Sequence, residues 1–208
     1  LTLGGTVAQS KTYDGTDAAT ITSIGILSGS IGSDAVSVSG GYTSAFADRN
    51  AGAGKTVTVS GLSLTGADSG NYSLSATAST TASITTRAIT LTATAQSKTY
   101  GASDPALGYS LTGGTLATGD TTYSGSLSRV AGENAGTRAI TRGTLAVADG
   151  NGGNNYALTF VGADLTISGR PITLAPSSAS GSNTKIYGSA DPALAVVLSS
   201  GTLSAGDS

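Results

Sequence analysis

Three lysines recur at one spacing in the sequence, and their side chains are the first candidates for chemistry. They are Lys11, Lys98 and Lys185, with 87 residues from each to the next. A lysine buried beside an asparagine and a carboxylate can form an intramolecular isopeptide bond. Because lysine is seldom fully buried, we favour a second interpretation, in which the aliphatic stem covers the edge of the core and the charge reaches water. The spacing alone leaves both interpretations open.

Oxygen-bearing side chains cluster at two further places and suggest a calcium site. The clusters are Asp14 with Asp17, and Asp149 with Asn151, Asn154 and Asn155. Neither cluster matches an EF-hand loop, and each holds few carboxylates for Ca²⁺. Aspartate and asparagine also form local turns with their own backbone. We therefore expect no cofactor, with calcium binding as the alternative.

Histidine and cysteine are absent from the sequence. Their absence excludes a His-assisted nucleophile, a disulfide and most zinc sites. A pair of carboxylates would still suit glycoside hydrolysis. Most of the aspartates, however, lie beside Gly, Asn, Ser or Pro in turn contexts. We therefore expect that the protein is not an enzyme.

The eight tyrosines supply aromatic faces, which can stack on sugar rings. Five of them occupy shared positions of the repeat, and side chains that recur in every copy are more often structural. These five are Tyr13, Tyr72, Tyr100, Tyr156 and Tyr187. The other three are the candidates for a ligand surface. They are Tyr42, Tyr109 and Tyr123.

Charge and hydropathy limit the partners of the chain. Ten basic and twelve acidic residues are spread singly along it, so the electrostatic footprint of a nucleic-acid binder is lacking. No stretch approaches the ~18 apolar residues that a membrane-spanning helix needs. We expect neighbouring repeats of the same chain as partners, with surface glycans or a host receptor as further partners, no nucleic acid and no membrane insertion.

The elements that position these side chains follow the same period as the lysines. Asp104-Pro105-Ala106-Leu107 returns at 191–194, and Gly119-Asp120 returns as Gly206-Asp207. A period of this length is too long for a solenoid repeat and suits a small domain. We predict modules at 1–86 and 87–169 and the truncated start of a third at 170–208, in an internal piece of a longer protein.

Short alternating segments predict the strands of these modules. They are 1–3, 36–39, 55–59, 81–84, 89–91, 164–167 and 172–174. Gly15 and Gly101 follow the repeated tyrosines and predict a turn there. No amphipathic segment of helical period is long enough for a helix. The pattern predicts an all-β protein made of small antiparallel β domains.

Near the end of the first module, Asp68-Ser69-Gly70-Asn71-Tyr72 leads into a strand. The second module has a longer version of this segment, between Asp149 and Tyr156. The pattern resembles the tyrosine corner of immunoglobulin-like sandwiches, in which the Tyr hydroxyl bonds to upstream backbone. We therefore expect Ig-like β-sandwiches, with a β-grasp-like sheet carrying a short helix as the alternative. Short linkers between modules predict an elongated array.

Two sets of motifs resemble known repeat families. Lys11-Thr12-Tyr13-Asp14-Gly15-Thr16, with the segment ending at Tyr72, resembles the YDG-type repeat. The segment 98–105, with Asn134-Ala135-Gly136-Thr137 and Asn155-Tyr156-Ala157-Leu158, is similar to the MBG repeat of the YGX type. Such repeats occur in secreted, filamentous-haemagglutinin-like adhesins of Gram-negative bacteria.

The resemblance implies a location outside the cell, at the surface of a Gram-negative bacterium, and a role in cell adhesion or biofilm formation. It supplies no catalytic residues. We expect non-catalytic modules that form part of the stalk of an adhesin and space a binding region. The alternative is that the modules bind a carbohydrate or a receptor directly.

Overall fold

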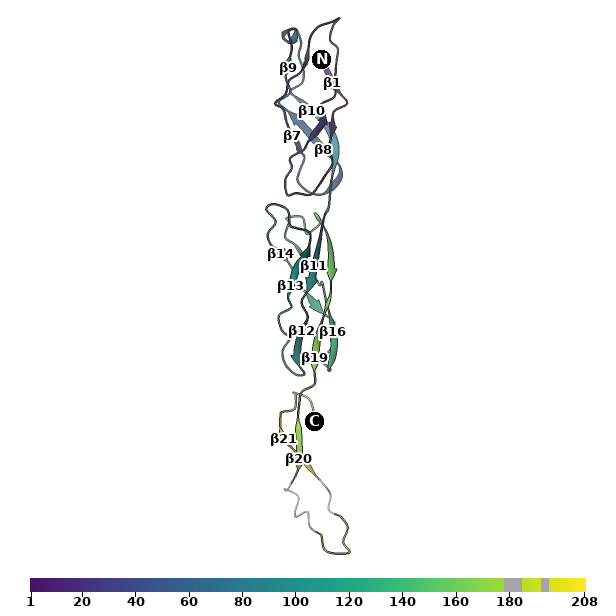
Figure 1. Cartoon of the computed structure of the whole chain (residues 1–208), viewed down its shortest axis with the longest axis vertical. Helices are drawn as coiled ribbons and strands as arrows, with labels where there is room; N and C mark the ends of the chain where they lie inside the picture. The colour runs from purple at the N-terminus through teal and green to yellow at the C-terminus, as the bar shows by residue number, and fades with distance from the viewer. Residues whose placement is uncertain (178–184, 192–194) are drawn as a thin grey trace. The chain divides into compact units, whose positions relative to one another are not determined.

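The computed structural model describes residues 1–177, 185–191 and 195–208. The repeated segments at Asn183-Thr184 and 192–194 therefore lie outside the described residues. The chain divides into two compact units, and Figure 1 labels the strands within them. Unit 1 comprises Leu1–Thr92, Leu111–Ser126 and Thr144–Val161. Unit 2 comprises Ala93–Ser110, Leu127–Gly143 and the described part of Gly162–Ser208.

The first repeat is built from ten short strands and one turn of 3₁₀ helix in the described chain. The elements are β1 (Thr2–Gly4), β2 (Val7–Ala8), β3 (Lys11–Thr12), β4 (Ile21–Ser23), β5 (Ile26–Ser28), β6 (Ser37–Val38), β7 (Thr43–Phe46), β8 (Gly52–Ser60), β9 (Leu64–Thr65), η1 (Ser69–Asn71) and β10 (Thr77–Thr85). The largest sheet has the order β3-β10-β8-β7, and the pairs β1-β5, β2-β4 and β6-β9 lie outside it.

The second repeat and the segment after it supply the remaining described strands. They are β11 (Arg87–Ala93), β12 (Gln96–Thr99), β13 (Tyr109–Gly113), β14 (Tyr123–Ser124), β15 (Ser128–Arg129), β16 (Gly136–Thr141), β17 (Ala146–Val147), β18 (Tyr156–Val161), β19 (Ala163–Ser168), β20 (Thr173–Pro176) and β21 (Val196–Ser200). They form the sheets β13-β11-β18 and β12-β19-β16-β15 and the pairs β14-β17 and β20-β21.

These elements confirm the predicted all-β class. The only helical element in the described ranges is η1. No helix in that part of the chain has the length and apolar character that crossing a membrane requires. The Ig-like sandwich and the elongated array stay predictions.

The expectation of antiparallel pairing throughout needs correction. β3 pairs in parallel with β10, β11 with β18, and β12 with β19. Parallel neighbours need a long connection between them. Each of these pairs joins an early strand of a repeat to a late one, so the intervening strands supply that connection. The sheets β3-β10-β8-β7 and β12-β19-β16-β15 therefore contain both parallel and antiparallel pairs.

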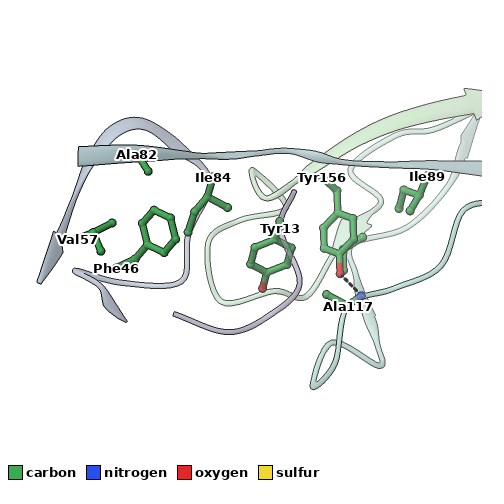
Figure 2. Packing of buried hydrophobic residues seen from close by; sticks show 9 residues of the cluster. Tyr13, Phe46, Val57, Ala82, Ile84, Ile89, Ala117 and Tyr156 are labelled. Carbon is green, nitrogen blue, oxygen red and sulfur yellow. Dashed lines mark hydrogen bonds between the residues drawn. The ribbon is translucent and has the colours of Figure 1, made fainter. Parts of the chain in front are cut away.

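Strand alternation places the apolar side chains of β8 inside unit 1. Val57 and Val59 are buried, whereas Thr56 and Thr58 between them are exposed. This is the period of two expected of a strand with one buried face. Residues of both repeats then share one core cluster, shown in Figure 2. Its buried members are Tyr13, Phe46, Val57, Ala82, Ile84, Ile89, Ala117, Val147 and Tyr156.

Unit 2 contains the sheet β12-β19-β16-β15 and the pair β20-β21. Leu165 and Ile167 of β19 and Ile140 of β16 are buried in it. β20 and β21 are much more exposed, and Leu174, Val196 and Val197 present large apolar side chains to solvent.

Candidate functional site

A buried group of hydrogen-bonded polar side chains in unit 1 surrounds Asp120. Asp120 lies in a turn that is closed by a hydrogen bond from the Asp120 N–H to the Ala117 carbonyl, 3.1 Å. Its carboxylate is 3 % exposed. Oδ2 accepts hydrogen bonds from the hydroxyls of Tyr13 at 2.9 Å and Tyr156 at 2.8 Å. The Ala117 N–H donates to the Tyr156 oxygen, 2.8 Å. We call Tyr13, Asp120 and Tyr156 the first junction, because they join the first repeat to the second.

Strand pairing fixes both tyrosines. The Tyr13 N–H, directly after β3, donates to the Thr85 carbonyl at the end of β10, 2.8 Å. Tyr156 begins β18 and lies opposite Arg87 of β11. The two rings meet edge to face, with centroids 5.5 Å apart and an interplanar angle of 76°. Figure 2 shows them side by side between Ile84 and Ile89. Such a geometry is the favoured one for aromatic pairs.

Both phenols of the first junction are held in the protonated form. Burial, together with the nearby Asp120 carboxylate, raises the pKa of Tyr156 to about 12, although the Ala117 N–H opposes this shift. Burial and Asp120 also raise the pKa of Tyr13. A protonated phenol is a hydrogen-bond donor, so each hydroxyl can donate a hydrogen bond to the buried carboxylate.

Arg49 places a positive charge next to this carboxylate. Its Nη2 lies 3.8 Å from Asp120 Oδ1 and donates to the Asp149 carbonyl at 2.9 Å. The Nη1 group donates to the Gly15 carbonyl at 3.4 Å. A buried carboxylate is costly unless it is paired and hydrogen-bonded. Arg49 and the two phenols together meet that requirement.

The Asp149 side chain stabilises the loop after β17 by accepting hydrogen bonds from the backbone of the same loop. Oδ1 accepts the N–H groups of Asn151 at 2.7 Å and Gly153 at 2.8 Å, and Oδ2 accepts that of Asn155 at 3.1 Å. Burial opposes the ionisation of Asp149, but these backbone donors outweigh it and lower its pKa. The carboxylate of one predicted calcium cluster therefore bonds to the backbone of its own turn.

The same loop presents Asn155 to the first repeat. Asn155 is fully buried. Its side-chain oxygen accepts the Ala51 N–H at 2.8 Å, and its side-chain nitrogen donates to the Asn50 side-chain oxygen at 3.2 Å. All four groups of this contact belong to unit 1. A buried amide with both ends paired ties the two repeats in one register.

A close backbone approach adds to the first junction. Gly15 has φ of 86°, and a Cβ at this position would lie 2.2 Å from the Thr118 carbonyl oxygen. Only glycine fits such a position without strain. Arg87 also spans the contact, because its Nε donates to the Thr115 carbonyl at 2.6 Å and its Nη1 to the Tyr13 carbonyl at 3.3 Å.

Unit 2 contains a second copy of this arrangement. Tyr100 donates to Asp207 Oδ1 at 2.9 Å, and the Asp207 N–H donates to the Ser204 carbonyl at 3.1 Å. The two residues are 107 positions apart, as Tyr13 and Asp120 are. We call Tyr100 and Asp207 the second junction.

A third copy of the turn lies within the first repeat and holds one tyrosine. Tyr72 donates to Asp34 Oδ2 at 2.6 Å and accepts the Ile31 N–H at 2.9 Å. The Asp34 N–H donates to the Ile31 carbonyl at 3.2 Å. The predicted bond from a tyrosine hydroxyl to upstream backbone thus exists, with the N–H as donor and an added aspartate.

Comparison with protein families identifies both repeats. Residues 1–82 match the family model of the YDG domain, and residues 89–166 match that of the MBG domain of the YGX type. The chain carries a YDG domain followed by an MBG domain. Neither the curated proteins nor the solved structures contain a significant match. The first junction therefore joins a YDG domain to an MBG domain.

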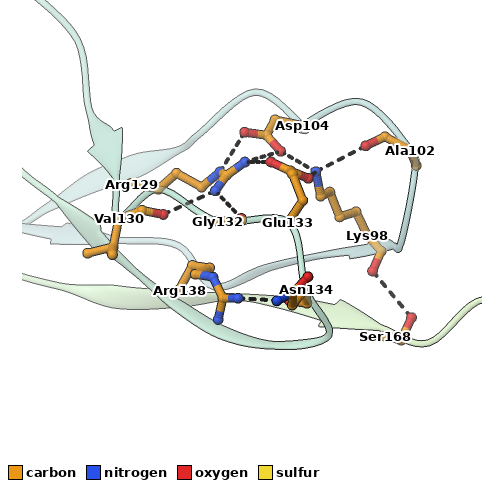
Figure 3. A network of polar contacts seen from close by, with 10 residues as sticks. All are labelled: Lys98, Ala102, Asp104, Arg129, Val130, Gly132, Glu133, Asn134, Arg138 and Ser168. Atoms are coloured by element: carbon orange, nitrogen blue, oxygen red, sulfur yellow. Dashed lines mark hydrogen bonds and ion pairs between the residues drawn. The ribbon is translucent and has the colours of Figure 1, made fainter. Parts of the chain in front are cut away.

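In the MBG domain, Lys98 lies in the ion-pair network of Figure 3. Its Nζ donates to Asp104 Oδ1 at 2.6 Å, to Glu133 Oε2 at 2.5 Å and to the Ala102 carbonyl at 3.0 Å. Arg129 binds both carboxylates and lies 2.6 Å from Asp104 Oδ2. Arg129 and Lys98 lower the pKa of Asp104 to about 2.

This network bears on the isopeptide hypothesis. Asp104 and Glu133 raise the pKa of Lys98. Amide formation needs an uncharged amine and a carboxyl group that can lose water, whereas the network stabilises the ammonium and the carboxylates. The side chain of Lys98 is only 4 % exposed, but its surroundings favour an ion pair.

The other two repeated lysines also pair with aspartate. Lys11 of the YDG domain lies 2.9 Å from Asp14 Oδ1, and Lys185 pairs with Asp191. Lys11 additionally donates to the Thr16 carbonyl at 2.9 Å. Asp14, a member of the first predicted calcium cluster, is thus engaged by lysine. Within the described residues, no three carboxylates gather into a metal-binding group.

The three tyrosines predicted to form a ligand surface are each half-buried. Tyr42 and Tyr123 belong to unit 1, where Tyr123 packs against the core, and Tyr109 belongs to unit 2. Tyr13 and Tyr156, by contrast, form a ring contact with each other. Tyr187 is fully exposed.

The residues that sequence reasoning missed are Asp120, Arg49 and Asp34. The repetition of Gly119-Asp120 as Gly206-Asp207 was a usable signal for the first of these. It marked the period of the repeat but did not show that the aspartate binds a tyrosine.

Proposed function

We propose that the chain forms non-catalytic structural spacer repeats in the stalk of a secreted adhesin at the surface of a Gram-negative bacterium. YDG and MBG domains fit the repeat domains of adhesin-like proteins. In this proposal the neighbouring repeats are the partners of each module. Nucleic-acid binding, membrane insertion and catalysis have no part in it.

The first junction is the observation that supports the proposal. A spacer transmits its length only if successive modules resist bending. The Tyr13–Asp120 and Ala51–Asn155 hydrogen bonds cross between the repeats and supply that resistance, and Tyr156 holds the same Asp120 carboxylate from within the second repeat. Removing one hydrogen-bonding partner leaves the other group buried and unpaired. The free-energy cost of that unpaired group exceeds the net stabilisation that the hydrogen bond provided.

A second candidate function is direct binding of a carbohydrate or a receptor. The half-buried Tyr42, Tyr109 and Tyr123 are the residues that could present aromatic faces. Tyr123 packs against the core of unit 1, which favours a structural role for this residue.

Binding assays on the whole chain separate the two functions. We would measure binding to a glycan array and to host cells, with Tyr42→Ala, Tyr109→Ala and Tyr123→Ala variants alongside. A spacer shows no saturable binding from folded protein. Saturable binding that one of these substitutions removes would overturn the spacer function and locate a site.

Amide hydrogen exchange tests whether the hydrogen bonds between the repeats hold them together, as the spacer function requires. The Ala51 N–H donates across the repeats to Asn155, whereas the Gly54 N–H donates to Ser83 within the first repeat. Asn155→Ala should therefore speed exchange at Ala51 and leave Gly54 unchanged. Slow exchange at Ala51 in the variant would show that the junction does not hold the repeats together.

A further inference from the structure

The three aspartate turns differ in how many tyrosines they hold. The turn at Asp120 holds two, one from each repeat. The turn at Asp34 holds Tyr72, which comes from its own repeat. The turn at Asp207 holds Tyr100, which comes from the preceding repeat. Within the residues that the structure describes, the second junction thus has the contact between repeats without a tyrosine that begins a strand of the β18 type.

The backbone and side chains around Asp207 reproduce the first junction. Arg170 binds the Thr202 hydroxyl, as Arg87 binds the Thr115 hydroxyl. Gly201 and its counterpart Gly114 both have positive φ, 83° and 72°. The second junction therefore shares these features with the first, although Asp207 is exposed where Asp120 is buried.

A pocket of about 260 Å³ opens at this point. Its lining includes Tyr100, Ile172, Leu203, Ser204 and Asp207. Four of these residues lie 87 positions after residues at the first junction. The fifth, Ile172, is matched to Ile89 because each is the last residue of an Arg-x-Ile segment next to β20 or in β11. The matched residues at the first junction are Tyr13, Ile89, Leu116, Ala117 and Asp120. There, the same positions pack around Tyr156 or bind its hydroxyl.

The sheet next to the pocket has an open edge in the same place. β11 lies between β13 and β18, whereas its counterpart β20 pairs with β21 alone in the described part of the chain. Leu174 of β20 is 56 % exposed, and its counterpart Leu91 of β11 is fully buried. Unpaired strand edges accept extended peptides by adding a strand.

We propose that the pocket of the second junction binds the tyrosine of an Asn-Asn-Tyr strand equivalent to Asn154–Val161, which pairs in parallel with β20. The phenol accepts the Ser204 N–H and donates to the Asp207 carboxylate. This proposal rests on the spacer function, because it names the segment that completes a junction between repeats. A folded second copy is a poor donor, since its own Tyr156 is buried.

The test uses the ¹⁵N-labelled chain of 208 residues and a synthetic peptide with the sequence of Asn154–Val161. Amide shifts are expected at Ser204, Asp207 and β20. A Tyr156→Phe version of the peptide should bind about tenfold more weakly, because it loses two hydrogen bonds to the pocket, one of them to a charged group. Changing the peptide leaves the fold of the chain untouched.

Substitutions in the chain supply matched controls. Asp207→Asn should weaken peptide binding, whereas Asp191→Asn, which alters an exposed aspartate paired with Lys185, should leave it unchanged. Equal binding of the Tyr and Phe peptides, shifts outside the pocket, no binding, or a stable dimer of the chain that blocks the peptide would each overturn the proposal. Glycan binding would overturn the spacer function without changing the peptide result, so the two failures can be told apart.

Discussion

Replacing Tyr13 by phenylalanine removes one hydroxyl from the first junction and leaves the ring in place. The ring keeps its edge-to-face contact with Tyr156, whose centroid lies 5.5 Å away. What is lost is the 2.9 Å hydrogen bond to Asp120. A hydrogen bond to a charged group contributes about 1.5–3 kcal/mol. Because Asp120 keeps Tyr156 and Arg49, we expect Tyr13→Phe to lower the free energy of unfolding by about 2 kcal/mol.

Chemical denaturation of the whole chain, followed by far-UV circular dichroism, measures this loss. The matched control is Tyr42→Phe, because Tyr42 is half-buried and has no hydrogen bond from its hydroxyl in the described residues. Substitutions without a structural partner usually change stability by less than about 0.5 kcal/mol. A Tyr13→Phe effect no larger than that of Tyr42→Phe would refute the assigned role of Asp120.

A double-mutant cycle with Tyr156→Phe sharpens the test. Tyr156 loses a bond to Asp120 and one from Ala117, so its substitution should cost more than that of Tyr13. Both hydroxyls bind the same oxygen of Asp120. Removing both leaves a buried carboxylate with only the 3.8 Å contact to Arg49, so we expect a loss beyond additivity of about 1 kcal/mol. Strict additivity would mean that the two phenols act independently.

Three further predictions concern pH and backbone space. The folded pKa of Asp104, about 2, lies below its usual 3.8, so the stabilisation from its carboxylate is present above pH ~4 and is lost as the pH falls toward 2. Asp104→Asn should make the melting temperature depend less on pH over that range. The folded pKa of Tyr156, about 12, lies above that of an unfolded tyrosine, so its stabilising effect is complete below pH ~10 and is lost as the pH rises toward 12. Absorbance at high pH should show late tyrosine ionisation whose amplitude falls in Tyr156→Phe but does not vanish, because the pKa of Tyr13 is raised as well. Gly15→Ala forces a Cβ to within 2.2 Å of the Thr118 oxygen at positive φ and should cost about 1–3 kcal/mol in denaturation, whereas Gly70→Ala, with open space around it, should cost less.

The sequence predicts the all-β class because short β-branched runs alternate between Gly and Asn turns. It also predicts the turns after the repeated tyrosines, where Gly15 and Gly101 have φ of 86° and 81°. The parallel pairing of β11 with β18 was not predictable from alternation, which is the same for parallel and antiparallel neighbours. It depends on how the chain returns between the two strands.

The pairing of Tyr13 with Asp120 was hidden for a related reason. The period identifies both residues as recurring, but each tyrosine could meet an aspartate of its own repeat or of the next. Only the folded chain shows that the Asp120 turn takes one tyrosine from each. The environment of Lys98 was equally hidden, because Glu133, which pairs with Lys98, and Arg129, which pairs with Glu133, come from a distant part of the sequence.

The polar character of the first junction has a physical reason in a chain of repeated domains. Residues of both repeats also share an apolar cluster, but hydrophobic burial is non-directional and by itself selects no single register. A buried carboxylate with two phenols is favourable only when each donor meets its acceptor, because an unpaired buried charge is expensive. Such a junction therefore selects one register, and a wrong neighbour is penalised by the bonds it fails to make.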